Sequence, residues 1–167
     1  VFYIVFNLRG KYTMKMVNIV FGTVYGSAQF TAETVTKEIA KLGFTAKLWQ
    51  PNELLGFVPP QNELLIVVSS TTGQGDLPED IAPWFNELKS NAPYLPSLQY
   101  SLIGLGDSSY ETYCGAIKQF DDLFTELGAK PLTERLEIDA CETMEPEIEA
   151  KTWIATWHST VISVNVA

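Results

Sequence analysis

The sequence has few cysteines, one histidine and no long hydrophobic run, and each scarcity excludes a class of protein or site. Cys114 and Cys141 are too few for a disulfide scaffold and lack metal-ligand spacing, so a reducing, cytoplasmic setting fits best. No apolar stretch approaches the roughly 20 residues that span a bilayer, which excludes a membrane-spanning helix. His158 lies in an expected helix, where a surface or packing role is more common than catalysis.

Positive charge is also scarce: 11 Lys and Arg residues stand against 20 Asp and Glu residues, for a formal net charge of −9. Arg9, Lys11 and Lys15 give the first fifteen residues a charge of +3, so the rest of the chain carries −12. A body of this charge repels nucleic acid and anionic membranes and attracts basic protein surfaces. We therefore expect no nucleic-acid or membrane partner. The alternative interpretation is that the acidity only keeps the protein soluble.

The size and composition fit one globular domain, since 167 residues with 46% hydrophobic side chains can bury a full core. Residues 1–15 stand apart because an apolar start is followed by basic residues, and Met16 precedes the first convincing strand. We expect 1–15 to be an N-terminal extension, non-native or disordered, and 16–167 to form the domain. An additional edge strand within 1–15 is the alternative.

Apolar runs and amphipathic stretches alternate along the chain, which predicts an α/β domain with a doubly wound parallel sheet and helices on both faces. The expected strands are 17–21, 45–49, 64–68, 100–104 and 132–138. The expected helices are 28–42, one starting at about 77, 115–127 and 146–164. Between 51 and 62 we expect a connection, because Pro59-Pro60 excludes a helix at that point. Trp153 and Trp157, four residues apart, are expected to pack in the core.

Three of the strands end in loops rich in Gly, Ser and Thr: 22–28, 69–76 and 105–110. Loops at the carboxyl ends of parallel strands converge where the strand order reverses, which predicts one composite ligand site. The first loop offers backbone N–H groups and two hydroxyls at a helix start, a phosphate cradle. It lacks the lysine of a nucleotide P-loop and the third glycine of a Rossmann fingerprint.

The other two loops suit a flat ring. Glycines on both sides of Gln74 allow unusual backbone angles or a peptide flip. Tyr110 and Tyr113 can present an aromatic face to a ring. A phosphate cradle, a flexible backbone strip and an aromatic wall together describe a site for flavin mononucleotide (FMN).

The three motifs GTVYGS (22–27), STTGQGDLP (70–78) and LGDSSY (105–110) resemble the three flavin-binding loops of flavodoxins. The resemblance extends from about Met16 to the C-terminus and is closest to short-chain flavodoxins of the YqcA and MioC type. The motifs also resemble the flavodoxin-like domains of sulfite reductase and cytochrome P450 reductase. This likeness implies a five-stranded parallel sheet in the order 2-1-3-4-5. It also implies an FMN-binding, low-potential carrier that moves single electrons from a reductase to acceptor enzymes.

The resemblance assigns a role to each loop. The phosphate would be bound by Thr23, Val24, Tyr25, Gly26, Ser27 and Ala28. The inner edge of the ring would be lined by Thr71, Thr72, Gly73, Gln74 and Gly75, and the Gly73 carbonyl would turn toward flavin N5 when a one-electron-reduced, protonated flavin forms. Tyr110 would stack on the outer face of the ring. The pocket would be completed by Leu105, Gly106, Asp107, Tyr113 and Cys114.

The implied function is that of an electron carrier and not an enzyme, since no residue needs to act as acid, base, nucleophile or metal ligand. A site without cations disfavours the negative charge of a reduced flavin, which implies a low potential. We expect a monomer whose partners are a basic-surfaced flavodoxin/ferredoxin-NADP reductase and redox acceptor enzymes. Acidic residues near the ring edge would steer them quickly, weakly and with strong salt dependence: Asp76, Glu79, Asp80, Asp107, Glu111, Glu142 and Glu145.

The sequence also bears on three other interpretations. A phosphorelay receiver needs an acidic cluster after the first strand and an aspartate after the third, and the sequence supplies neither. An NAD(P)H-dependent flavin quinone reductase would need a second nucleotide site, for which no extra loop is present. A flavin-free binding module remains open because of Thr72, which stands where the related reductase domains have an aromatic residue.

Overall fold

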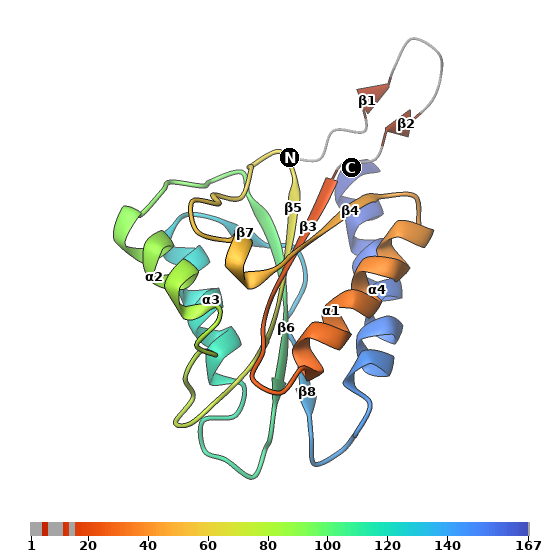
Figure 1. The fold of residues 1–167 in the computed structure, drawn as a ribbon. Helices are drawn as coiled ribbons and strands as arrows, with labels where there is room; N and C mark the ends of the chain where they lie inside the picture. The colour runs from red at the N-terminus through yellow and green to blue at the C-terminus, as the bar shows by residue number, and fades with distance from the viewer. Residues whose placement is uncertain (1–4, 7–11, 14–15, 167) are drawn as a thin grey trace.

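The structure is a computed structural model that describes residues 5–6, 12–13 and 16–166. Its centre is a parallel sheet in the order β4-β3-β5-β6, with β7 and β8 both pairing the far edge of β6 (Figure 1). The strands of this sheet are β3 (Met16–Gly22), β4 (Thr45–Trp49), β5 (Leu64–Ser70), β6 (Gln99–Gly106), β7 (Lys130–Pro131) and β8 (Leu136–Asp139). The helices are α1 (Ser27–Lys41), α2 (Ala82–Asn91), α3 (Gly115–Glu126) and α4 (Pro146–Val166), with a 3₁₀ turn η1 (Pro51–Glu53).

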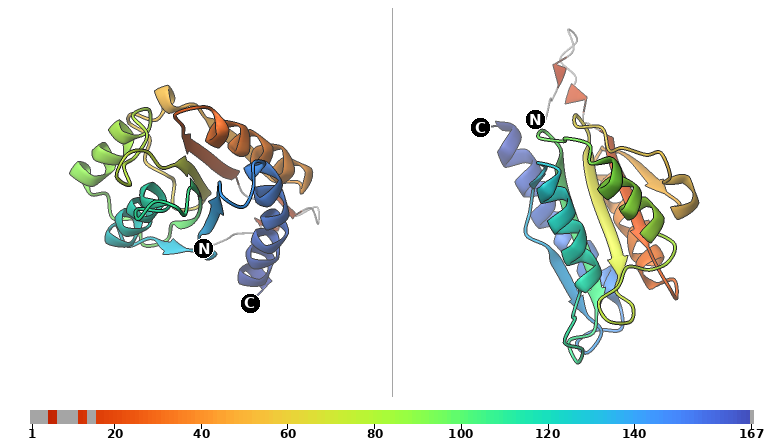
Figure 2. Two further views of the ribbon diagram at one scale, coloured as in Figure 1. Left: turned by 90° about the horizontal axis from the view of Figure 1, so that it is seen from below. Right: turned by 90° about the vertical axis from the view of Figure 1, so that its left-hand side faces the viewer.

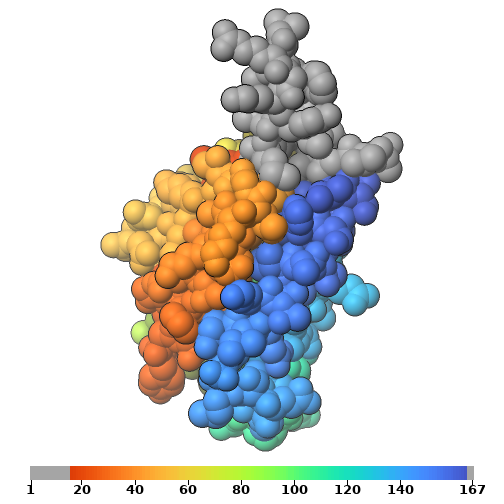
Figure 3. All heavy atoms as spheres, turned by 90° about the vertical axis from the view of Figure 1, so that its right-hand side faces the viewer, coloured from red at the N-terminus to blue at the C-terminus, as the bar shows by residue number. Residues whose placement is uncertain are grey.

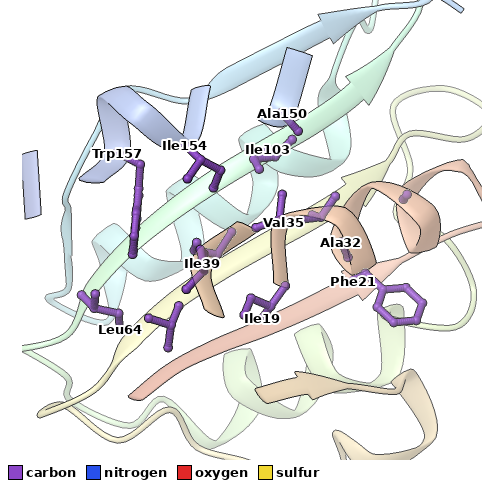
Figure 4. Packing of buried hydrophobic residues seen from close by; sticks show 14 of the residues in the cluster. Ile19, Phe21, Ala32, Val35, Ile39, Leu64, Ile103, Ala150, Ile154 and Trp157 are labelled. Carbon is purple, nitrogen blue, oxygen red and sulfur yellow. The ribbon is translucent and has the colours of Figure 1, made fainter. Parts of the chain in front are cut away.

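Helices cover both faces of this sheet, as expected for a doubly wound fold (Figures 1 and 2). The helices α1 and α4 lie side by side on one face (Figure 3). Their core includes Ile19 and Ile103 from the sheet, Val35 from α1 and Trp157 from α4 (Figure 4). The fully buried Trp157 confirms the core role predicted for it.

The helices α2 and α3 cover the opposite face. There Val20 and Val67 of the sheet belong to the same buried cluster as Trp84 of α2 and Phe120 of α3. Because neighbouring residues of one strand, such as Ile19 and Val20, belong to different clusters, the central strands are apolar on both sides. That burial explains why these strands appear in the sequence as continuous hydrophobic runs.

The fifth strand position corrects a prediction. In place of one strand over 132–138, the structure has β7 and β8, separated by residues 132–135. Leu132 still donates its N–H to the Tyr100 carbonyl at 2.7 Å, but the chain then leaves the ladder. Leu132 is buried in the core, whereas Glu134 and Arg135 are exposed, so no apolar side chain continues the strand beyond Leu132 and Thr133. The Arg135 guanidinium instead pairs with the Asp121 carboxylate on α3.

The second helix also begins later than predicted. The chain turns after Pro78, whose carbonyl accepts N–H bonds from Ile81 and Ala82, and α2 starts only at Ala82. Pro83 stands in the first turn, where a proline costs no intrahelical hydrogen bond. His158 packs its ring edge-to-face on Phe44, with centroids 6.0 Å apart.

Of residues 1–15, only Val5–Phe6 (β1) and Tyr12–Thr13 (β2) are described, and these pair antiparallel in a sheet of their own. The rest of this segment lies outside the described residues, so the proposed extension stays a prediction. Among the described residues, every helix is too short or too polar to cross a membrane.

Candidate functional site

The loops that follow β3, β5, β6 and β8 meet at one end of the sheet, the lower end in Figure 1, and enclose a cavity of about 510 Å³. All three predicted loops contribute to its walls. The predicted site residues that line it are Thr23, Val24, Tyr25, Ser27, Thr71, Thr72, Gly73, Leu105, Gly106, Asp107, Tyr110, Tyr113 and Cys114. The three separate motifs therefore line one cavity.

The first loop carries β3 into α1 through a tight turn. Gly26 has φ +96°, a left-handed conformation that favours glycine, and donates its N–H to Thr23 Oγ1 at 2.9 Å. The first N–H groups of any α-helix lack an intrahelical partner. Among the described residues no side chain caps the start of α1, so its first-turn N–H groups are available to a ligand. With Thr23 and Ser27 beside them in the cavity wall, these groups form an anion-binding site that uses no cation.

The second loop is a narrow hairpin. Thr72 and Asp76 exchange two backbone hydrogen bonds, of 2.9 and 2.7 Å, and the three residues between them form the tip. Gly73 and Gly75 have φ +52° and +88°, which the turn requires and which other residues rarely adopt. The Gln74 N–H donates to Asp76 Oδ2 at 3.3 Å, so the tip peptide is held by a carboxylate.

The helix α3 holds both ends of the second loop. The Gln119 side-chain amide donates to the Gly75 carbonyl at 2.8 Å, and the Ala116 N–H donates to Thr71 Oγ1 at 3.2 Å. Gly75 also packs so closely on Gly115 that a Cβ at Gly115 would lie 2.7 Å from the Gly75 Cα. These contacts fix the Thr71 and Gly75 sides of the loop, and Gly73 between them lines the cavity.

The third loop supplies tyrosines and a fixed negative charge. Tyr110 is 64% exposed, whereas Tyr113 is partly buried. Hydrogen bonds from Ser109, together with one from the Cys141 thiol at 3.1 Å, lower the pKa of Asp107. Burial raises the pKa of the Cys114 thiol to about 11 and also raises the pKa of Tyr113. At neutral pH these groups are therefore an anion, a neutral thiol and a neutral phenol.

Four predicted residues do not line the cavity. Ala28 is fully buried in the core, and Gly75 is covered by Thr112 and Gly115. Gly26 shapes the first turn without lining the wall, and Gln74 is exposed at the loop tip. These residues hold the loops in shape or lie at their edge.

Sequence reasoning missed a fourth wall. The residues that it did not name are Ser70, Thr112, Ile138, Ala140, Thr143, Met144 and Pro146. Five of them follow or end β8, which terminates at the same edge of the sheet as β6. The chain there has no Gly- or Ser-rich motif, so the only available signal was the rule that successive loops of a parallel sheet converge.

Comparison with known proteins points to one family. The model of the family described as "Flavodoxin" matches residues 19–153. "Flavodoxin YqcA" of Escherichia coli is 41% identical over 144 residues, covering 86% of this chain and 97% of that protein. "Protein MioC" of Escherichia coli is 31% identical over the same shares of the two chains. The flavoprotein alpha-component of NADPH sulfite reductase from Vibrio cholerae is 33% identical over 87% of this chain but only 23% of its own length.

Solved structures agree. A single-residue mutant of flavodoxin from Pseudomonas aeruginosa superposes with a TM-score of 0.78 at 36% identity, covering 87% of this chain and 97% of that one. A short-chain flavodoxin associated with a non-canonical PDU bacterial microcompartment gives a TM-score of 0.73 at 23% identity, covering 88% of this chain and 99% of that one, which supports the fold alone.

Proposed function

The chain belongs to the flavodoxin family, and from this membership we propose that it binds FMN and carries low-potential single electrons between a reductase and acceptor enzymes. One observation of the structure carries the proposal. The loops at the carboxyl ends of β3, β5 and β6 enclose one cavity, with a hydroxyl-lined helix N-terminus and three tyrosines in its walls. The bound flavin would supply the one-electron chemistry, and the protein would supply binding and orientation.

The first loop fits a phosphate monoester. The uncapped first turn of α1 offers N–H donors and the positive end of the helix dipole, and Thr23 and Ser27 add hydroxyl groups. Among the described residues, no lysine or arginine lines the cavity. Neutral donors suit a phosphate that anchors a cofactor and takes part in no transfer reaction.

The remaining walls fit a flat, largely apolar ring. Leu105 and Ile138 are buried beneath the cavity, and Tyr110 and Tyr113 provide aromatic faces. Thr72 lies in the wall formed by the second loop and has no ring of its own to stack on a flavin. We expect the third loop to supply the aromatic contact.

The ionisable groups of the cavity support a carrier that has no catalysis of its own. Asp107 has a lowered pKa, whereas Tyr113 and Cys114 have raised ones, so none of the three changes its protonation near neutral pH. A general acid or base works best with a pKa near the working pH. The proposal therefore assigns the protein no substrate turnover.

Acidic side chains around the cavity support a basic-surfaced reductase as partner. Asp76, Glu79, Glu111, Glu142 and Glu145 are exposed, as their expected steering role requires. A negative surface accelerates encounter with a positive one, and salt weakens this effect. We further propose that the protein acts as a monomer in the cytoplasm, where its two free thiols stay reduced.

The test is an absorption spectrum of the purified chain, identification of the flavin released on denaturation, and stepwise chemical reduction. We expect bound FMN that takes up electrons one at a time, and no NADPH oxidation by the protein alone. A colourless protein that fails to take up added FMN would contradict the proposal and favour a flavin-free binding module. NADPH turnover without a second protein would instead indicate a flavin quinone reductase.

A further inference from the structure

The Asp80 carboxylate holds the first loop from outside the cavity. Both of its oxygens accept the Thr23 N–H, each at 3.1 Å, across 57 positions of sequence. Thr23 lines the cavity, whereas Asp80 is not among the described residues that line it. Any influence of Asp80 on a ligand therefore passes through the Thr23 backbone.

Thr23 extends this support toward α1. Its hydroxyl accepts the Gly26 N–H at 2.9 Å, and Gly26 is the residue that starts the helix in a left-handed conformation. Asp80, Thr23 and Gly26 thus form a chain of hydrogen bonds that sets where the first turn of α1 begins. Those first-turn N–H groups are the anion donors of the cavity.

Packing makes the support rigid. A Cβ at Gly22 would lie 2.4 Å from Ile81 Cγ2, so the chain beside Asp80 is in direct contact with the start of the first loop. Burial raises the pKa of Asp80, and the hydrogen bond from Thr23 opposes that rise. The carboxylate is therefore partly desolvated, and the loop supplies a hydrogen bond to it.

The sequence placed Asp80 among the acids that would steer a partner. Its half-buried position and its hydrogen bond to Thr23 give it a second role, in the structure of the first loop. An anion near a phosphate site also repels the phosphate, so positioning and repulsion act in opposite directions. Variants that separate the hydrogen bond from the charge can distinguish the two effects.

We propose that Asp80 is a positioning residue for the phosphate-binding loop and makes the site select FMN over riboflavin, which lacks the phosphate. This inference rests on the proposed function, because it takes the first loop as the site of the FMN phosphate. The carboxylate accepts a hydrogen bond from the Thr23 N–H and so fixes the turn. The first-turn N–H donors of α1 can then bind the phosphate without rearrangement of the loop. A ligand without phosphate gains nothing from this order.

The experiment is titration of the full-length apoprotein with FMN and, separately, with riboflavin. Asp80→Ala should weaken FMN binding about tenfold, the effect of losing one charge-assisted hydrogen bond, and change riboflavin binding by less than about twofold. Asp80→Asn should stay within about threefold of the parent for FMN, because its amide oxygen still accepts from Thr23. Glu79→Ala, an exposed neighbour that loses the same charge, is the control and should change neither affinity.

Four outcomes would overturn the inference while leaving the proposed function in place. Equal loss of FMN and riboflavin would indicate general destabilisation, and tighter FMN binding by Asp80→Ala would show that repulsion dominates. Asp80→Asn as weak as Asp80→Ala would assign the effect to charge. In the unsubstituted apoprotein, a Thr23 amide that exchanges hydrogen as fast as exposed amides would show that the supporting bond is absent, whether or not the variants fold. Failure of the unsubstituted chain to bind either flavin would instead refute the proposed function, and this inference with it.

Discussion

Cys114 shows how burial sets the chemistry of a single residue. The residue borders the cavity and is fully buried, and its backbone has φ +53° at the start of α3. Because burial raises its pKa to about 11, the reactive thiolate is scarce at neutral pH. A low-pKa cysteine would invite oxidation beside a redox site, and this one is protected.

We predict that a thiol-alkylating reagent at pH 8 modifies Cys141, which is exposed, and leaves Cys114 unmodified in the folded protein. The pKa of Cys114 is raised above its unfolded value, so its contribution to stability is complete below that value, near 9, and is lost as pH rises toward about 11. Mass spectrometry of labelled protein between pH 8 and 11 checks this. Equal labelling of both cysteines at pH 8 would contradict it.

Thr72 stands where the resemblance to reductase domains implies an aromatic residue. It lies in the wall of the second loop, and no ring stands there to cover a flavin. An aromatic side chain stacked on a ligand ring adds about 0.5–1.5 kcal/mol beyond its buried area. An aromatic side chain at position 72 should therefore increase the affinity for flavin.

We predict that Thr72→Tyr binds FMN roughly 2- to 12-fold more tightly than the parent, from that stacking energy. Thr72→Val, which removes the hydroxyl and adds no ring, is the matched control and should leave the affinity nearly unchanged. Fluorescence titration of the apoproteins measures both. An unchanged affinity in Thr72→Tyr would mean that the tyrosine does not reach the ring or that Tyr110 already supplies the needed contact.

At the scale of elements, the α3 helix acts as a clamp on the second loop. Its Gln119 side chain and Ala116 N–H hold the two ends of the hairpin, while close packing of Gly75 on Gly115 removes the space for movement at its base. This clamp differs from the support given by Asp80, because the second loop is proposed to face the flavin ring and the first loop the phosphate.

We therefore predict that Gln119→Ala weakens FMN and riboflavin binding alike, by about five- to tenfold for the loss of one hydrogen bond of about 1–1.4 kcal/mol. Glu126→Ala, an exposed change at the end of the same helix, should have no effect. The same two titrations that test Asp80 measure this prediction. A loss confined to FMN would show that Gln119 acts on the phosphate side instead.

The elements also show what sequence could and could not predict. Buried strands such as β5 could be predicted from the sequence. Helices cover both faces of the sheet, so such a strand is a continuous apolar run. The split of the fifth strand was missed because the chain leaves the sheet after Leu132 and Arg135 pairs with Asp121 of α3, a contact that depends on tertiary placement. The fourth wall of the cavity was missed because its residues, such as Met144, follow the end of β8, where the sequence has no recognisable motif.

In the molecule as a whole, exposed acidic and apolar side chains lie together at the cavity end of the sheet. The chain beyond residue 15 carries −12, and exposed acids lie on loops at the cavity end, including Glu142 and Glu145 after β8. Exposed apolar side chains lie at the same end: Tyr25 is 97% and Met144 90% exposed, and both line the cavity. A partner that docks there meets an apolar contact with acidic surroundings, an arrangement that favours fast, reversible encounter.

We predict that the double variant Glu142→Lys/Glu145→Lys slows reduction of the bound flavin by a basic-surfaced reductase several-fold at low ionic strength. Long-range attraction is screened within about 8 Å at physiological salt, so the difference between variant and parent should shrink as salt increases. The control is Glu134→Lys, an exposed change in the break between β7 and β8 and outside the cavity walls, which alters net charge but not the charge at the docking end. Stopped-flow measurements across a salt series distinguish the two cases.

If Glu134→Lys slows the reaction as much per unit charge as the double variant, net charge alone governs encounter. A salt-independent loss in the double variant would mean that the two glutamates act by direct contact and not by steering.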